Sequence, residues 1–157
     1  MSDFIPDSLF QILVANMPLV SVDLIVRNGE GEVLLGRRVN RPAQNFWFVP
    51  GGRIRKGERI GEAFSRLTAE ELGFSTRMSD AKFHGVYEHH YADSYAGTDF
   101  GTHYVVLSYE LGLPADLTGL PRQQHADYRW WPIDLLLGSA DVHPYTKAYF
   151  QNDSNMS

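Results

Sequence analysis

The chain has 157 residues, a formal net charge of −5 and no cysteine. This length suits a single domain with a substantial hydrophobic core, and the acidic balance argues against a protein that binds nucleic acid. Without cysteine, disulfides, thiolate metal sites and cysteine nucleophiles are excluded. A bound metal must therefore use oxygen or nitrogen ligands, and a hard cation such as Mg²⁺ suits oxygen ligands best.

Neither a membrane span nor a targeting segment is evident in the sequence. There is no run of about 18 apolar residues. No lysine or arginine precedes Arg27, whereas a secretory or transit peptide would carry positive charge near its start. We therefore expect a cytoplasmic protein that does not associate with membranes.

Hydrophobic periodicity and turn residues predict the first elements: a helix over 6–15, strands over 21–27, 33–38 and 46–49, and a turn over 28–31. In the first strand, Asp23 lies in the interior, where aspartate is disfavoured. The apolar residues of that strand are expected on the opposite face: Val20, Val22, Leu24 and Val26. Gly51 and Gly52 follow the third strand and let a ligand approach the backbone closely.

A helix that ends at Leu72-Gly73 follows these glycines, since glycine readily takes the left-handed position after a helix. At 3.6 residues per turn, Ile60, Phe64 and Leu67 form one apolar stripe. Glu71 falls within that stripe at i+4 from Leu67. A carboxylate there must be neutral, paired or bound to a cation, so we expect Glu71 either to meet an arginine or to ligate a metal.

Basic residues gather in a window without acidic ones. Between Val33 and Gly57 there is no Asp or Glu, yet six cations lie there: Arg37, Arg38, Arg41, Arg53, Arg55 and Lys56. The window predicts a site for a small anionic ligand, and a solvated basic face is the alternative.

The second half of the chain predicts paired strands over 83–91 and 103–111, a short strand over 127–131, and helices over 132–137 and 144–151. Residues 92–102 form a long polar loop, a candidate lid or dimer contact. In the loop over 113–125, His125 is the histidine best placed to act as a general base, because imidazole titrates near neutral pH. Strands mixed with two or three helices indicate an α/β sandwich around a mixed sheet.

The spacing Gly52-x5-Glu58-x7-Arg66-x3-Glu70-Glu71-x-Gly73-Phe74 resembles the Nudix box, the metal–diphosphate signature of Nudix hydrolases. One departure stands out, because Leu67 occupies a position where the family pattern carries a glutamate. The resemblance implies a single-domain α/β/α sandwich around a mixed β-sheet. We expect this domain over residues 1–152, with a disordered tail over 153–157.

Several further segments resemble the Nudix subfamily of GDP-mannose mannosyl hydrolases, which cleave at the sugar carbon: 18–23, 40–44, 47–53, 66–68, 97–100, 102–107 and 124–125. In that subfamily the box itself carries Leu67-Thr68. The resemblance implies Mg²⁺-dependent hydrolysis of GDP-mannose, and of GDP-glucose, to GDP and free sugar, with inversion at the anomeric carbon. It also implies a homodimer whose partner is a small nucleotide sugar and not a nucleic acid.

The resemblance also implies roles for single residues. One Mg²⁺ would be held by Glu71, Gln124 and the carbonyl of Gly51. His125 would activate water, Arg38, Arg53 and Tyr104 would bind the departing diphosphate, and Asp23 and His89 would position the sugar. Phe4, Ile5 and Phe10 would lie in the nucleotide site, although Phe4 and Phe10 could instead pack on the body of the protein.

Three alternatives stay open at this stage. The chain could be a Nudix pyrophosphatase that attacks phosphorus and releases GMP and a sugar phosphate, or a catalytically inactive nucleotide-sugar sensor. In a third scheme, Asp23 would act as a nucleophile and the anomeric configuration would be retained.

Overall fold

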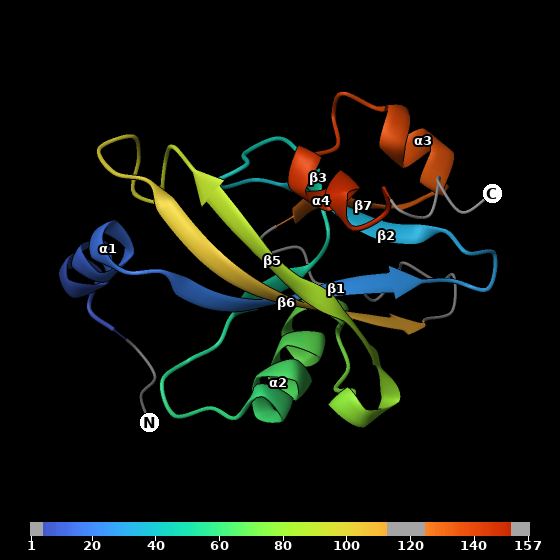
Figure 1. The fold of residues 1–157 in the computed structure, drawn as a ribbon, viewed down its shortest axis with the longest axis horizontal. Coiled ribbons are helices and arrows are strands. Elements are labelled where there is room, and N and C mark those ends of the chain that lie inside the picture. The colour runs from blue at the N-terminus through green and yellow to red at the C-terminus, as the bar shows by residue number, and fades with distance from the viewer. Residues whose placement is uncertain (1–4, 113–124, 152–157) are drawn as a thin grey trace.

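The computed structural model describes residues 5–112 and 125–151, and this part of the chain forms a seven-stranded mixed sheet with flanking helices (Figure 1). The strands are β1 Leu19–Arg27, β2 Val33–Arg38, β3 Trp47–Phe48, β4 Gly51–Arg53, β5 Lys82–Tyr91, β6 Thr102–Gly112 and β7 His125–Trp131. The helices are α1 Asp7–Asn16, α2 Ile60–Leu72, α3 Ile133–Gly138 and α4 Pro144–Ala148, with a short 3-10 helix at Met78–Asp80.

Strand β1 is the centre of the sheet. It pairs in parallel with β6 along its whole length, from Leu19 opposite Tyr104 to Arg27 opposite Gly112. Its other edge is shared, because β4 pairs with Ser21–Asp23 and β2 pairs at Arg27. β3 pairs with β2 instead, so the segment 47–53 changes partner strand between Phe48 and Gly51. The sheet is therefore forked at this point.

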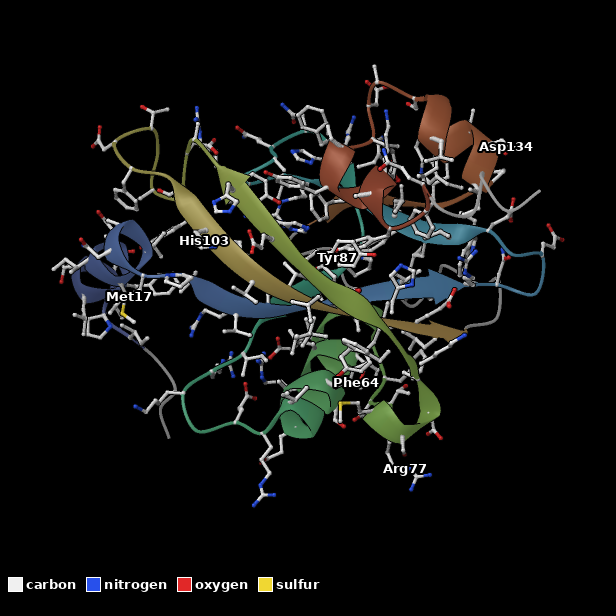
Figure 2. All side chains as sticks on the ribbon, in the orientation of Figure 1. Met17, Phe64, Arg77, Tyr87, His103 and Asp134 are labelled. Carbon is white, nitrogen blue, oxygen red and sulfur yellow. The ribbon has the colours of Figure 1, made fainter. Side chains whose placement is uncertain are left out.

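Side chains of β1 enter two separate cores because they alternate between the two faces of the sheet. Val22, Leu24 and Val26 pack with Phe64 and Leu67 of α2. Ile25 packs on the other face with Leu136, Val142, Tyr149 and Phe150. Accordingly, α2 lies on one side of the sheet and α3 and α4 lie on the other (Figure 1). Figure 2 shows Phe64 and Tyr87 on these opposite sides. The predicted α/β/α sandwich is confirmed.

The end of α2 follows the prediction. Gly73 takes a left-handed conformation at φ 88°, and its N–H donates to the Ala69 carbonyl at 3.1 Å. Phe64, Leu67 and Glu71 are buried as expected. None of the helices in residues 5–112 and 125–151 is long and apolar enough to cross a membrane.

Several predicted details were wrong. Ile60 and Val20 are not in the core, since 41% and 42% of their surfaces are exposed. Both lie at the starts of their elements, beyond the cluster in which α2 covers β1. The predicted strand over 46–49 is only Trp47–Phe48, and the glycines after it form β4, which sequence patterns missed. β7 begins at His125 instead of 127, and the last helix ends at Ala148, with a turn after it.

Candidate active site

A cavity of about 310 Å³ opens beside the fork between β1 and β2. Seven residues predicted from the sequence to act in the site line it: Phe10, Asp23, Arg38, Gly51, Arg53, His89 and Tyr104. Ile5 and Glu71 are not among its lining residues. Phe4 and Gln124 lie outside the described residues. The backbone of His125 is opposite Arg38 in the β2–β7 pairing, which brings the predicted base to the same end of β2.

β4 places the Gly51 backbone directly against Asp23, since the two residues are partners in the β1–β4 register. A Cβ atom at residue 51 would lie 2.4 Å from the Val22 carbonyl oxygen and 2.6 Å from Oδ1 of Asp23. No side chain can fit there without shifting the backbone of β1. Glycine is therefore required for close packing of strand β4 on β1, and Gly51 itself lines the cavity.

Two buried carboxylates lie near this junction. Burial raises the pKa of Asp23 to about 7, although the Tyr149 hydrogen bond and the charge of Arg38 act in the opposite direction. Burial also raises the pKa of Glu71 to about 7. The negative charges of Glu70 and Asp23 act in the same direction, whereas the positive charge of Arg38 acts to lower this pKa. None of the described residues forms a hydrogen bond or ion pair with the Glu71 carboxylate. The expectation that an arginine pairs with Glu71 is therefore not met within this part of the chain.

Arg53 and Tyr104 form a second wall. The guanidinium of Arg53 lies 5.0 Å from the centre of the Phe10 ring, a cation–π distance. Burial lowers the pKa of Arg53, while Tyr104 acts to raise it. Burial has the opposite effect on Tyr104 and raises its pKa, because in both residues it disfavours the charged form. Both groups would meet a bound anion in a partly dehydrated setting, where charge interactions are stronger than in water.

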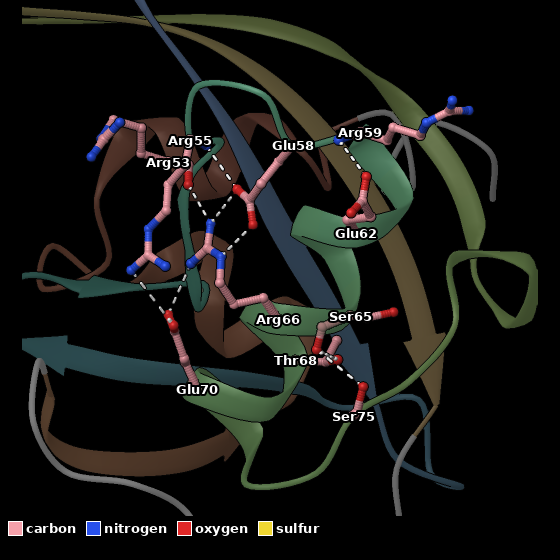
Figure 3. A network of polar contacts seen from close by, with 10 residues as sticks. All are labelled: Arg53, Arg55, Glu58, Arg59, Glu62, Ser65, Arg66, Thr68, Glu70 and Ser75. Carbon is pink, nitrogen blue, oxygen red and sulfur yellow. Dashed lines mark hydrogen bonds and ion pairs between the residues drawn. The ribbon is translucent and has the colours of Figure 1, made fainter. Parts of the chain in front are cut away.

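The remaining carboxylates of the predicted box are engaged with Arg66 (Figure 3). Its Nε donates to Glu58 at 2.7 Å and one terminal nitrogen donates to Glu70 at 3.0 Å. The other terminal nitrogen donates to Glu58 at 2.9 Å and to the Arg53 carbonyl at 2.8 Å. Arg66 thereby joins α2 to the end of β4.

The loop between β5 and β6 packs on its own chain. Tyr95 donates to Asp7 of α1 at 2.7 Å, and its ring lies 5.3 Å from the Phe10 ring. Asp93 pairs with Arg41 at 3.3 Å. Tyr95 and Arg41 both line the cavity, so this loop helps to build the site. Its predicted role as a lid or dimer contact stays a prediction.

Sequence reasoning missed the residues behind the cavity. Tyr149 is buried, donates a short hydrogen bond to Oδ2 of Asp23 and lies 3.4 Å from Nε2 of His89. Burial and the neighbouring His143 lower the pKa of His89 to about 4, and its ring stacks on Tyr145 at 4.4 Å. No local pattern could have revealed this contact, because Asp23 and Tyr149 are 126 positions apart.

Comparison with known proteins identifies the family of this chain. Residues 17–151 match the NUDIX domain. The chain belongs to the Nudix family. Over 145 residues this Nudix chain is 38% identical to the low-salt glycan biosynthesis protein Agl8 of Haloferax volcanii, and the match covers 92% of this chain and 88% of Agl8.

Solved structures share the Nudix fold. The MutT protein of Methanosarcina mazei Go1 gives a TM-score of 0.70 at 22% identity, covering 90% of this chain and 96% of that one. The NUDIX domain of Shewanella oneidensis NrtR, complexed with ADP ribose, gives a TM-score of 0.65 at 17% identity, and the match covers 98% of this chain and 100% of that one. At these identities the likeness concerns the fold.

The Nudix family implies a divalent metal, and the residues present fit a hard cation. No group of three or more acidic or histidine side chains suited to a metal occurs within 5–112 and 125–151. The candidate donors are instead the unpaired Glu71 carboxylate and the Gly51 backbone at the cavity wall. Oxygen donors of this kind suit Mg²⁺. A cation would also compensate the buried charge of Glu71, which is otherwise costly.

Proposed function

We propose that this Nudix protein hydrolyses GDP-mannose, and GDP-glucose, to GDP and free sugar with one Mg²⁺, by attack of water on the anomeric carbon. One observation carries the proposal. Leu67 stands where the Nudix pattern has a glutamate and is buried against Gly52, at which an added Cβ would lie 2.5 Å from a Leu67 methyl group. Glu71 is consequently the one acidic residue of the described α2 that is buried. The carboxylate cluster that would activate water beside phosphorus is reduced.

Attack of water at the anomeric carbon does not need a cluster of carboxylates to activate the water. The diphosphate is a good leaving group once its charge is neutralised, and Arg38 and Arg53 line the cavity with positive charge for that purpose. Mg²⁺, held by Glu71, Gln124 and the Gly51 carbonyl, would supply the rest of the neutralisation. Tyr104 would donate a hydrogen bond to the same diphosphate.

The chemical step needs a base, and we assign that role to His125. A bond forms from the water oxygen to the anomeric carbon while the bond from that carbon to the diphosphate oxygen breaks. The water proton passes to His125, and the bonding electrons leave with GDP. Asp23 and His89 hold the sugar hydroxyls, and Phe4, Ile5 and Phe10 lie near the nucleotide. A single displacement gives inversion.

The names of two similar proteins point to glycan and nucleotide chemistry in those proteins. Agl8 is described as a protein of low-salt glycan biosynthesis, and the NrtR domain binds ADP ribose, a nucleoside diphosphate joined to a sugar. Both facts concern those proteins: the name of Agl8 gives no substrate, and at 17% identity the NrtR domain shows the shared fold alone.

Hydrolysis in isotopically labelled water tests the proposal. With GDP-mannose and Mg²⁺, we expect the label in mannose, none in GDP, and NMR detection of the inverted anomer as the first product. Label in GMP or mannose phosphate would establish the Nudix pyrophosphatase alternative. Retention of configuration would point to Asp23 as a nucleophile, and binding without any turnover would indicate a sensor.

A further inference from the structure

Behind the cavity, Tyr149 joins two of its lining residues. Asp23 and His89 face the cavity from β1 and β5, and Tyr149 does not line it. Tyr149 follows α4, is only 2% exposed, and contacts both residues through its hydroxyl group. The hydroxyl is thus a link between two groups that can meet a ligand.

The position of Tyr149 is fixed by several independent contacts. Its backbone carbonyl lies 3.0 Å from Nε2 of His84 on β5, and its ring packs edge-on against Tyr87 with centres 4.6 Å apart. One turn earlier in the chain, the Thr146 hydroxyl accepts from the Val49 N–H at 3.3 Å. The Tyr149 ring, and with it the hydroxyl oxygen, is therefore held in place beside Asp23 by contacts of both the ring and the backbone.

The direction of the hydrogen bonds follows from what each group can donate. A carboxylate only accepts, so the Tyr149 proton points to Oδ2 of Asp23. The Tyr149 oxygen can then only accept from the nearby Nε2 of His89, which must carry the ring proton. Burial holds the pKa of His89 near 4, so its ring is neutral and has one N–H. The other nitrogen, Nδ1, is left as an acceptor.

Two acceptors remain accessible after this arrangement. Neither Oδ1 of Asp23 nor Nδ1 of His89 has a hydrogen-bond partner in residues 5–112 and 125–151. The His89 ring also contacts the rings of Phe48 and Tyr91, and these contacts leave Nδ1 without a donor. Within the same residues, Trp131 Nε1 is the one polar side-chain atom that is both sealed from solvent and without a partner. The two acceptors are therefore not sealed, and the space adjoining both residues is the cavity.

We propose that Tyr149 is a positioning residue that orients Asp23 and fixes His89 as the Nε2–H tautomer, so that the cavity offers two acceptors to neighbouring hydroxyl groups of the sugar. The sugar as ligand rests on the proposed function, whereas the tautomer of His89 does not. Vicinal hydroxyls of a hexose are donors that match such a pair of acceptors.

NMR of histidine side-chain nitrogens in the full chain at pH 8 tests the tautomer. We expect the Nε2–H form of His89 in the native protein and growth of the Nδ1–H form in Tyr149→Phe, which removes only the hydroxyl. Tyr145→Phe is the matched control. It keeps the ring stacked on His89 and removes a hydroxyl that bonds the His90 backbone instead. A native Nδ1–H form, or an unchanged tautomer in Tyr149→Phe, would overturn the proposal even if one variant folded poorly.

Ligand binding separates positioning from general support of the fold. For Tyr149→Phe we expect the KM for GDP-mannose to rise roughly five- to tenfold, as for loss of one well-oriented hydrogen bond. The affinity for GDP, which lacks the mannose and its hydroxyls, should not change. Equal losses for both ligands would mean that Tyr149 acts only structurally and would refute the proposal. If the native protein does not turn over GDP-mannose, the proposed function fails while the NMR result still decides the role of Tyr149.

Discussion

Neighbouring carboxylates at the end of α2 have opposite surroundings. Glu71 is 6% exposed and unpaired within the described residues. Glu70 has about half of its side chain in solvent and pairs with Arg66. The two residues have the same chemistry and adjacent positions, so they form a natural pair for testing the metal site.

Glu71→Gln is expected to abolish the stabilisation of the protein by Mg²⁺, whereas Glu70→Gln should retain it. A ligand that binds only the folded state raises the midpoint of thermal unfolding, by an amount that grows with the logarithm of the ligand concentration divided by its Kd. Thermal unfolding at increasing Mg²⁺ concentration measures the effect. Equal Mg²⁺ stabilisation in Glu71→Gln and the native protein would remove Glu71 from the metal site.

The raised pKa of Glu71 also sets a dependence on pH without metal. Its pKa is about 7 in the folded state and about 4.5 when unfolded, so the folded protein holds the proton more tightly. This contribution to the free energy of unfolding is complete below pH 4.5 and is lost as pH rises through 7. The stability of the native protein relative to Glu71→Gln should therefore decline over that range, and a difference that grows with pH would contradict the assignment.

His125→Gln should lower kcat by roughly 10²- to 10⁴-fold, the usual contribution of a general base, with little change in KM. His90→Gln is a suitable control, because His90 is exposed on β5 and does not line the cavity. Steady-state kinetics with GDP-mannose and Mg²⁺ give both constants. An effect on KM alone would exclude His125 as the base.

At the scale of elements, the junction of β4 with β1 and α2 depends on two glycines with different neighbours. An added Cβ at Gly51 meets backbone and Asp23, while one at Gly52 meets only the end of the Leu67 side chain. A side chain can move aside more easily than a strand. The two positions should therefore differ in their tolerance of a methyl group.

Gly51→Ala should destabilise the fold more than Gly52→Ala, for which overpacking costs about 1–3 kcal/mol. The double variant Gly52→Ala with Leu67→Ala should recover part of that loss relative to the sum of the single changes, because the smaller side chain leaves room for the new methyl group. Denaturant unfolding of the four variants provides the comparison. Strict additivity would show that Leu67 does not press on Gly52.

How far the sequence predicts these elements depends on the range of the contacts. The burial of Glu71 follows from helical periodicity, whereas local turn chemistry predicts a close approach of a ligand at Gly51 and not the observed approach of β1. β4 escaped prediction because its glycines carry no hydrophobic alternation and its pairing is made by the backbone. Ile60 was misplaced because periodicity identifies a helix face without saying how far the sheet beneath it extends. Tyr149 could not be assigned, because its partners lie on distant strands.

At the scale of the whole molecule, the quaternary structure is a prediction from the subfamily resemblance. We expect a homodimer, since the resemblance implies one. Sedimentation equilibrium over a range of concentrations measures the mass directly. A single species of 17.8 kDa at all concentrations would contradict the expectation and would show that the cavity works within one chain.

The parallel pairing of β1 with β6 has a consequence for the order of events in folding. The partners are separated by 85 positions, as Leu19 and Tyr104 illustrate. A long loop must close, with a loss of chain entropy, before contacts between such distant residues can stabilise the fold. Local pieces such as α2 can form early, but the cavity needs β1, β6 and the segment after α4 together. The protein is therefore expected to gain its ligand-binding ability late, in the same kinetic step that completes the sheet.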